Sequence, residues 1–193
     1  MTDEHDGPVI HPTAIVEDGA SIGSGSHVWH HCHVRIGADV GAECTLGKNV
    51  FVDEGVVIGA RSKIQNNVSL YRGVTLESEV FVGPSAVFTN DLRPRAASAS
   101  WELVATTVRR GASIGANATI VCGVELGAWC MVAAGSVVTR SVSPHQLVMG
   151  NPARPAGWVC ACGEVLSRDP SPLADAVCPS CGSPHVGDQS DHK

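Results

Sequence analysis

Residues 28–58 read VWHHCHVRIGADVGAECTLGKNVFVDEGVVI, and an apolar residue returns at every sixth position from Val28 to Ile58. Two places before each one stands a small or β-branched residue, such as Cys32 or Cys44. Side chains repeat every ~3.6 residues on a helix and every ~2 on a strand, so a period of six indicates a repeat architecture. The period covers most of the chain, through Ile10, Val16, Ile22, Val28, Val34, Val40, Leu46, Val52, Ile58, Ile64, Leu70, Leu76, Val82, Phe88, Val108, Ile114, Ile120, Leu126, Val132 and Val138.

Such hexads predict a prism of short parallel strands. On each flat side one large and one small residue point inward, and the next residues turn a corner. Three hexads form one coil, so residues 18 apart in the sequence are expected to stack, and a spacing of ~4.8 Å gives a prism roughly 30 Å tall. Residues that tolerate a positive φ are expected at the corners, namely Gly23, Gly47, Gly59, Gly83, Gly115, Gly127, Asn49, Asn67 and Asn117.

The composition agrees with a narrow interior of small aliphatic side chains. Aromatic residues make up 4% of the 193 residues, and the formal net charge is −6. Without a long basic run, nucleic acid is not an expected partner. Residues 1–8 form a polar arm, and no apolar run approaches ~18 residues, so neither a secretory signal nor a membrane span is predicted. We therefore expect a cytoplasmic protein without membrane partners.

The cysteines inside the repeat have a structural interpretation. Cys32, Cys44 and Cys130 fall on the small inward position, where a thiol acts as a compact hydrophobe. Cys122 lies two places beyond Ile120, toward a corner, and receives no role.

A second group of cysteines lies beyond the repeat, in the pairs Cys160 with Cys162 and Cys178 with Cys181. This arrangement resembles a zinc ribbon, in which two thiolate pairs on turns close a tetrahedral site. Four thiolates leave no open coordination position, so a bound Zn²⁺ would be structural. Only one residue separates the first pair instead of the usual two, and a disulfide or a metal-free hairpin is the alternative.

The repeat is interrupted once. Phe88 and Val108 are 20 residues apart, so one hexad has gained 14 residues, which must leave the prism at a corner as a loop over 90–107. Long loops on rigid scaffolds are disproportionately functional. A tolerated insertion is the alternative.

Polar residues gather on the corners near this loop. The spacing of 18 places Asn90 in one column with Arg72 and Glu54. Further columns join Thr89 to Tyr71 and Asp53, and His30 to Lys48 and Asn66. This mixture of amide, phenol, guanidinium and imidazole suits a sugar and its phosphates, which need many directional hydrogen bonds, and a solvated surface is the alternative. The histidines of the segment 27–33 do not recur 18 or 36 residues later, as metal ligands from neighbouring coils would require. They are interpreted as surface or interface residues, with substrate contact as the alternative.

Four segments resemble the nucleotide-sugar N-acetyltransferases of the hexapeptide-repeat proteins, namely Val28–His30, Lys63–Tyr71, Val80–Asn90 and Gly111–Ile120. Among these bacterial enzymes are those for UDP-2-acetamido-3-amino-2,3-dideoxyglucuronate and for dTDP-3-amino-3,6-dideoxyhexoses. The resemblance covers residues 9–158 and implies an all-β fold, a left-handed parallel β-helix. It also implies transfer of an acetyl group from acetyl-CoA to an amino group, often at C3, of a UDP- or dTDP-linked sugar.

The resemblance further implies a homotrimer with active sites in the grooves between adjacent prisms. Contacts to the sugar nucleotide are implied for Gln65, Asn66, Asn67, Tyr71, Arg93 and Trp101. The segment Gly150–Arg154 resembles the CoA-binding end of the wider superfamily. Implied contacts to CoA comprise backbone groups near Gly115, Ala116 and Ala134, the phosphate-binding Arg140 or Arg154, and Pro152.

The acceptor amine must attack the thioester in its neutral form. Related O-acetyltransferases use a histidine just beyond the corresponding strand, where this chain has Thr89, Asn90 and Asp91. The missing histidine favours an amine acceptor. Asn90, with Asp91, is expected to orient the amine while the CoA thiolate or solvent takes the proton and a backbone N–H stabilises the oxyanion. His30 is the competing base.

Two other functions remain open. A sugar O-acetyltransferase would need a histidine from another subunit, and a non-catalytic β-helix scaffold would assemble through its tail. The predicted organisation is a polar arm (1–8), a β-helix domain (9–150), a linker (151–159), a four-cysteine module (160–186) and a disordered tail (187–193).

Overall fold

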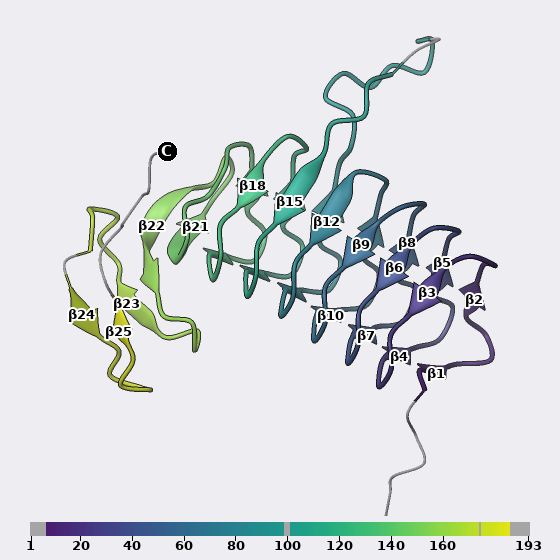
Figure 1. Ribbon diagram of the computed structural model, residues 1–193. Helices are drawn as coiled ribbons and strands as arrows, with labels where there is room; N and C mark the ends of the chain where they lie inside the picture. Colours follow the sequence, from purple (N-terminus) through teal and green to yellow (C-terminus); the bar gives the residue numbers. More distant parts are fainter. Residues whose placement is uncertain (1–6, 99–100, 174, 186–193) are drawn as a thin grey trace, which may run out of the picture.

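The computed structural model describes residues 7–98, 101–173 and 175–185. Most of its strands form three sheets that are the sides of a solenoid, with the inserted loop projecting from one side and the cysteine-rich tail at one end (Figure 1). In the described part of the chain no helix is long and apolar enough to cross a membrane. Residues 1–6 of the predicted arm and the predicted tail 187–193 lie outside the described residues.

The solenoid is built from strands that are mostly two residues long. Sheet 1 comprises β1 (Val9–Ile10), β4 (His27–Val28), β7 (Thr45–Leu46), β10 (Lys63–Ile64), β13 (Phe81–Val82), β16 (Ser113–Ile114), β19 (Met131–Val132), β21 (Gln146–Met149), β22 (Arg154–Val159) and β23 (Val165–Ser167). Sheet 2 comprises β2 (Ile15–Val16), β5 (His33–Val34), β8 (Phe51–Val52), β11 (Ser69–Leu70), β14 (Val87–Phe88), β17 (Thr119–Ile120) and β20 (Val137–Val138). Sheet 3 comprises β3 (Ser21–Ile22), β6 (Asp39–Val40), β9 (Val57–Ile58), β12 (Val74–Leu76), β15 (Thr106–Val108) and β18 (Glu125–Leu126).

The register confirms the predicted coil of 18 residues. Lys63 pairs with Thr45 in one neighbouring coil and with Phe81 in the other, and both pairings are parallel. Past the insertion, Phe81 pairs with Ser113, because the loop adds its residues to one coil. The chain is therefore an all-β parallel solenoid, consistent with a left-handed β-helix.

The interior follows the predicted inward positions. The large residues Leu46 and Ile64 are fully buried, and so are the small residues Cys44 and Cys130. Burial raises the pKa of the Cys130 thiol to about 12, so this cysteine behaves as part of the core. Cys122 is buried as well.

The corners correct one expectation about glycine. Asn49, Asn67 and Asn117 do adopt positive φ, between 56° and 63°. The predicted corner glycines do not, and they serve a different purpose. A Cβ on Gly115 would lie 2.4 Å from the backbone nitrogen of Ala134, so glycine is required because the next coil packs directly on this backbone.

Beyond the parallel strands, the chain reverses direction and adds two antiparallel strands to sheet 1. Strand β22 pairs antiparallel with β21, the last parallel strand of sheet 1, and β23 pairs antiparallel with β22. The segment predicted as a linker (151–159) thus contains a paired strand. A separate hairpin follows, made of β24 (Ala176–Val177) and β25 (Pro184–His185).

Candidate functional site

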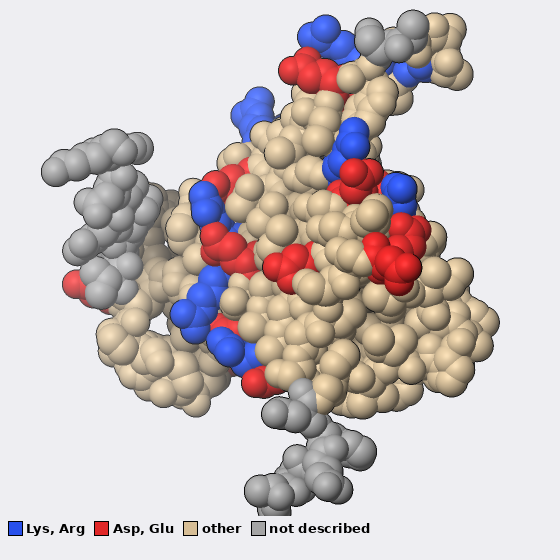
Figure 2. All heavy atoms as spheres, turned by 45° about the vertical axis from the view of Figure 1, so that its right-hand side comes forward, with Lys and Arg blue, Asp and Glu red and all other residues tan. Residues whose placement is uncertain are grey.

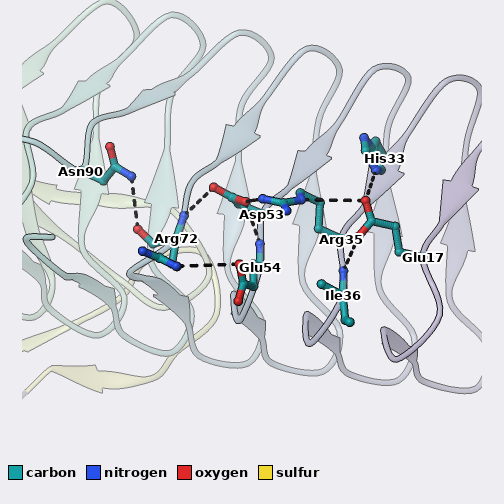
Figure 3. Close-up of polar contacts among 8 residues, drawn as sticks. All are labelled: Glu17, His33, Arg35, Ile36, Asp53, Glu54, Arg72 and Asn90. Carbon is teal, nitrogen blue, oxygen red and sulfur yellow. Dashed lines mark hydrogen bonds and ion pairs between the residues drawn. The ribbon is translucent and has the colours of Figure 1, made fainter. Parts of the chain in front are cut away.

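A ladder of polar contacts runs along the corner between sheets 2 and 3, which we call corner 2–3 (Figure 3). Glu17 accepts a hydrogen bond from Nε2 of His33 at 2.7 Å, and Asp53 accepts one from Nη1 of Arg35 at 2.7 Å. The other carboxylate oxygen of Asp53 accepts a hydrogen bond from the backbone N–H of Arg72 at 3.2 Å. Successive coils are thereby joined through their side chains. On the face shown in Figure 2, basic and acidic side chains likewise lie beside one another.

The ladder holds its charged groups in their ionised forms. A hydrogen bond from the backbone N–H of Ile36 lowers the pKa of Glu17. Burial opposes ionisation of Asp53, but hydrogen bonds from the Glu54 backbone and the Arg35 side chain outweigh it and lower the pKa of this carboxyl. Arg35 gains a raised pKa from the same contact. Fixed charges therefore extend along the corner.

Asn90 lies in the next coil, where the inserted loop leaves the solenoid. Its Nδ2 donates a hydrogen bond to the carbonyl oxygen of Arg72 at 3.5 Å, as the predicted column requires, and its Oδ1 points away from Arg72 (Figure 3). Nη1 of Arg72 lies 3.7 Å from Oε2 of Glu54, and its guanidinium carbon lies 5.9 Å from the centre of the Trp101 ring. A hollow of about 190 Å³ is lined by Arg35, Asp53, Glu54, Arg72, Asn90 and Trp101.

The inserted loop begins after β14 and returns to the solenoid at β15. Its base is closed by a hydrogen bond from the backbone N–H of Val104 to the carbonyl oxygen of Asn90 at 3.1 Å. Oδ1 of Asp91 accepts a hydrogen bond from the backbone N–H of Arg93 at 2.7 Å, so this carboxylate stabilises a turn within the loop. A second hollow, of about 460 Å³, is lined by Asp91, Leu92, Arg93, Ser98, Trp101, Glu102 and Val104. Trp101 borders both hollows.

Gln65, Asn66 and Asn67 lie on the opposite edge of sheet 2, at the corner between sheets 1 and 2, which we call corner 1–2. Oδ1 of Asn66 accepts a hydrogen bond from the backbone N–H of Lys48 at 2.9 Å. Oδ1 of Asn67 accepts one from Nδ2 of Asn49 at 3.0 Å. These two asparagines therefore stabilise the stacked turns themselves, while Gln65 lines a hollow of about 340 Å³ with Trp29, His30, Thr45, Gly47, Lys48 and Asn66.

The other predicted residues of corner 1–2 lie in its lower and upper coils. The ring of His30 stacks on that of His11, with 3.5 Å between their centres. Farther along, the backbone N–H of Gly135 donates to the carbonyl oxygen of Ala116 at 2.8 Å, next to the close approach of Gly115 and Ala134. A path of tightly stacked backbone thus extends along this corner toward the C-terminal end.

The predicted site residues therefore divide between the two edges of sheet 2. Strand β11 separates Asn67, which precedes it, from Tyr71, which follows it. Asn90, Asp91, Arg93 and Trp101 belong to the side of Tyr71, whereas His30, Gln65, Gly115, Ala116 and Ala134 belong to the side of Asn67. Within one chain, the structure does not bring Asn90 and His30 together.

Two predicted phosphate-binding residues meet at the C-terminal end of the solenoid. Arg140 and Arg154 line one hollow of about 180 Å³, together with Ser141, Gln146 and Pro155. Both arginines are exposed, and Pro152 lies in the exposed turn that leads into β22. The pairing of two guanidinium groups at one hollow suits an anionic ligand.

The four cysteines of the tail converge. Their Sγ atoms all lie within 4.8 Å of one another. Cys160 and Cys181 are 3.6 Å apart, and so are Cys162 and Cys178. Hydrogen bonds from Ser183 lower the pKa of Cys181 to about 6, which favours its thiolate form.

Sequence reasoning placed Arg72, Glu54 and Asp53 in columns near the loop but named none of them as a contact residue, and it missed Arg35. A signal was present, because Arg35 and Asp53 are opposite charges one coil apart. The sequence did not indicate that Arg72 lies over the ring of Trp101, because the inserted loop does not follow the repeat.

Comparisons with known proteins agree with this architecture. Residues 105–140 match the family described as bacterial transferase hexapeptide (six repeats), and residues 13–53 and 34–72 match the hexapeptide repeat of succinyl-transferase. A dTDP-3-amino-3,6-dideoxy-alpha-D-galactopyranose 3-N-acetyltransferase of Aneurinibacillus thermoaerophilus is 54% identical over 61 residues, which are 32% of this chain and 32% of that protein. The match therefore spans about a third of that relative's length.

Solved structures are similar over a longer stretch. A hexapeptide-repeat acetyltransferase of Vibrio cholerae O1 biovar eltor, in complex with acetyl coenzyme A, is 29% identical with a TM-score of 0.50, covering 63% of this chain and 70% of that one. A mutant GDP-perosamine N-acetyltransferase of Caulobacter crescentus, with CoA and GDP-perosamine, is 22% identical with a TM-score of 0.52, covering 78% and 57%, and is alike in fold. On its repeat, its solenoid and these matches, the chain belongs to the hexapeptide-repeat transferase family.

Proposed function

We propose that this protein transfers the acetyl group of acetyl-CoA to an amino group, at C3, of a UDP- or dTDP-linked amino sugar. One observation carries the proposal. The hollow at Asn90 combines an amide, an indole ring and paired charges, and no histidine is among its described lining residues. The similarity to a dTDP-sugar 3-N-acetyltransferase supports the same substrate class.

The acceptor would bind along corner 2–3 and the inserted loop. Trp101 is 52% exposed and offers a ring face on which a nucleobase can stack. Arg93 is exposed in the same loop and would bind the diphosphate, while Tyr71 would donate a hydrogen bond to the sugar. The sugar amine would then lie against Asn90.

Asn90 would position the amine without acting as a base. Because its Nδ2 is directed to the Arg72 carbonyl, its Oδ1 remains directed outward to accept a hydrogen bond from the amine. The amine nitrogen attacks the thioester carbonyl, the C–N bond forms, and the C–S bond of the tetrahedral intermediate breaks. The departing CoA thiolate takes the proton released by nitrogen. Asp91 would support the loop through its hydrogen bond to Arg93.

The donor would lie along corner 1–2. Pantetheine amides would bond to the stacked backbone at Gly115, Ala116 and Ala134, and the phosphates of CoA would reach Arg140 and Arg154. Donor and acceptor residues lie on opposite edges of sheet 2, so one chain cannot present both to the same substrates.

A homotrimer would resolve this separation. If sheet 2 of each copy faces a common threefold axis, corner 1–2 of one copy adjoins corner 2–3 of the next. Apart from His33, the outward residues of sheet 2 suit this placement, because Ile15, Phe51, Ser69, Val87, Thr119 and Val137 cannot carry a charge, whereas sheet 3 turns Asp39 and Glu125 outward. We further propose that the coil is left-handed and that the cysteine cluster holds a structural Zn²⁺.

The nature of the acylated atom tests the proposal against its alternatives. Incubation with acetyl-CoA and the amino sugar, followed by mild alkali, should leave the acetyl group in place because an amide resists hydrolysis. Loss of the acetyl group in alkali would instead establish O-acetylation. A protein that binds no acetyl-CoA would be a scaffold.

A further inference from the structure

The two ends of the solenoid differ in how far their apolar residues are exposed. At the N-terminal end, the first strand is open, with Val9 52% and Ile10 41% exposed. At the C-terminal end, Val142 and Val148 are both buried, at 5% and 3%. Strand β22 and the tail lie at this second end (Figure 1). The tail therefore acts as a cap, which repeat folds need where the repeat stops.

The cap has almost no apolar core of its own. Among its described residues beyond Val159, the buried side chains are those of Cys160, Cys178 and His185. Two of these three are members of the cysteine cluster. A module of this size needs a cross-link or a metal to hold its shape, because burial of apolar surface is insufficient.

The geometry of the cluster suits a metal and not a disulfide. Four thiolates at ~2.3 Å from a tetrahedral Zn²⁺ would be roughly 3.8 Å apart, whereas disulfide sulfurs are ~2.05 Å apart. The Sγ atoms of Cys160 and Cys181 are separated by 3.6 Å, and the second cross pair has the same distance. Each cross pair joins the two halves of the tail.

Both halves also present their cysteines on a turn that is closed by the backbone N–H of a glycine. The backbone N–H of Gly163 donates to the carbonyl oxygen of Cys160 at 2.9 Å, and that of Gly182 donates to the carbonyl oxygen of Cys178 at 2.9 Å. Oγ of Ser180 donates to Glu164 at 2.6 Å and so joins the turns beside the cluster. The shorter spacing between Cys160 and Cys162 therefore does not prevent the four sulfurs from converging.

Strand β22 connects this cluster to the arginine-lined hollow. It begins at Arg154, which lines the hollow with Arg140, and it ends at Val159, directly before Cys160. Its C-terminal end is held by a hydrogen bond from the backbone N–H of Val159 to the carbonyl oxygen of His145 at 2.8 Å. The indole of Trp158 donates to the carbonyl oxygen of Ser171 at 2.8 Å. Cys160 and Arg154 therefore lie at the two ends of one short, hydrogen-bonded strand.

We propose that a tetrathiolate Zn²⁺ centre in the tail holds β22 against β21, and thereby fixes Arg154 beside Arg140 for binding an anionic group. Without metal, the four thiol or thiolate groups within 4.8 Å are drawn together only by weak S–H···S contacts, and the cap loosens from its cysteine end. The part of the proposal that concerns CoA as the anionic ligand rests on the proposed function. The metal centre and its hold on β22 do not.

Metal content and hydrogen exchange test the centre directly in the full chain. The purified protein should contain one zinc per chain, and removal of zinc by a chelator under reducing conditions should accelerate amide exchange at Val159 and Cys160 at least about tenfold. Cys181→Ser should reproduce this loss. The matched control Ser180→Ala removes a contact between the same turns but no ligand, and it should retain zinc and slow exchange.

Affinity for CoA tests the connection to Arg154. The dissociation constant of CoA should rise about tenfold in the metal-free protein, and Arg154→Ala should raise it similarly while removing any further effect of the chelator. Unchanged exchange at β22 without metal, or a disulfide detected by mass, would overturn the metal centre. If the zinc-loaded protein binds no CoA, the proposed function fails, and hydrogen exchange still decides the role of the metal.

Discussion

Arg72 faces Trp101, with the guanidinium carbon 5.9 Å from the centre of the indole ring. The same arginine donates its backbone N–H to Asp53 and accepts a hydrogen bond from Asn90 at its carbonyl oxygen. One corner residue therefore contacts the ion-pair ladder, the proposed amine-positioning group and the inserted loop. An exposed cation–π contact contributes ~0.5–1 kcal/mol, so its main effect is to orient the ring.

Replacing Trp101 by Ala should weaken binding of the sugar nucleotide. Stacking of a base on an aromatic side chain contributes ~1–3 kcal/mol, so KM for the sugar nucleotide should rise about tenfold or more. Steady-state kinetics should show an unchanged KM for acetyl-CoA, and Trp101→Phe should retain most of the affinity. Equal KM values for Trp101→Ala and the parent protein would show that no base stacks on this ring.

Asn90 and His30 make opposite predictions for catalysis. Asn90→Ala should lower kcat about 100-fold, because loss of one positioned polar group in a transition state has effects of that order. His30→Ala should change kcat less than about twofold, because the proposed mechanism gives the proton of the amine to the departing CoA thiolate. Both variants should be compared by circular dichroism to exclude misfolding. The reverse pattern would assign the base to His30.

The trimer model predicts different effects for two exposed valines. Val87 on sheet 2 is 47% exposed, and Val57 on sheet 3 is 41% exposed. Val87→Arg should give monomers in light scattering, because it places a charge at the proposed threefold axis, whereas Val57→Arg should remain trimeric. If both variants keep one oligomeric state, sheet 2 does not form the interface.

Glu77 should make stability depend on pH. A hydrogen bond from Arg109 lowers the pKa of Glu77 below its ordinary value of 4.5. The contribution of ionised Glu77 to stability is therefore fully present at pH values above 4.5. It is lost as the pH falls through the lowered pKa that Glu77 has in the folded chain. Glu77→Gln should reduce Tm at pH 7, and its difference from the parent protein should shrink toward pH 3.

The control for this prediction is Glu43→Gln, which changes an exposed glutamate at the same kind of corner. Its Tm should follow that of the parent protein across the whole pH range. A constant difference between Glu77→Gln and the parent would mean that the pair with Arg109 does not titrate with folding.

The repeat made much of the fold predictable. A residue at an inward position must be apolar because it contacts the coils on either side, so Leu46 and Cys130 could be assigned to the core directly. The constant coil length also predicted the stacking of Asn90 on Arg72, which the hydrogen bond between them confirms. Because the period is constant, a single register predicts the position of the repeat residues along the full length of the solenoid.

Features that depend on close contacts between coils were less predictable. Gly115 was expected to supply a positive φ, whereas it is required by the backbone of the next coil. The antiparallel return of β22 was missed because Arg154–Val159 does not follow the repeat. Each predicted site residue lies on the corner next to the strand that it borders, and this divides the site between two corners. Resemblance to a family does not tell which of these residues come together within one chain.

The most direct test is the release of free CoA thiol from acetyl-CoA with a panel of UDP- and dTDP-linked 3-amino and 4-amino sugars, with mass analysis of the products. Turnover is expected with a 3-amino sugar, with the addition of one acetyl group to nitrogen. Turnover confined to 4-amino sugars would contradict the C3 assignment. No turnover with any amino sugar, although acetyl-CoA binds, would contradict the proposed reaction.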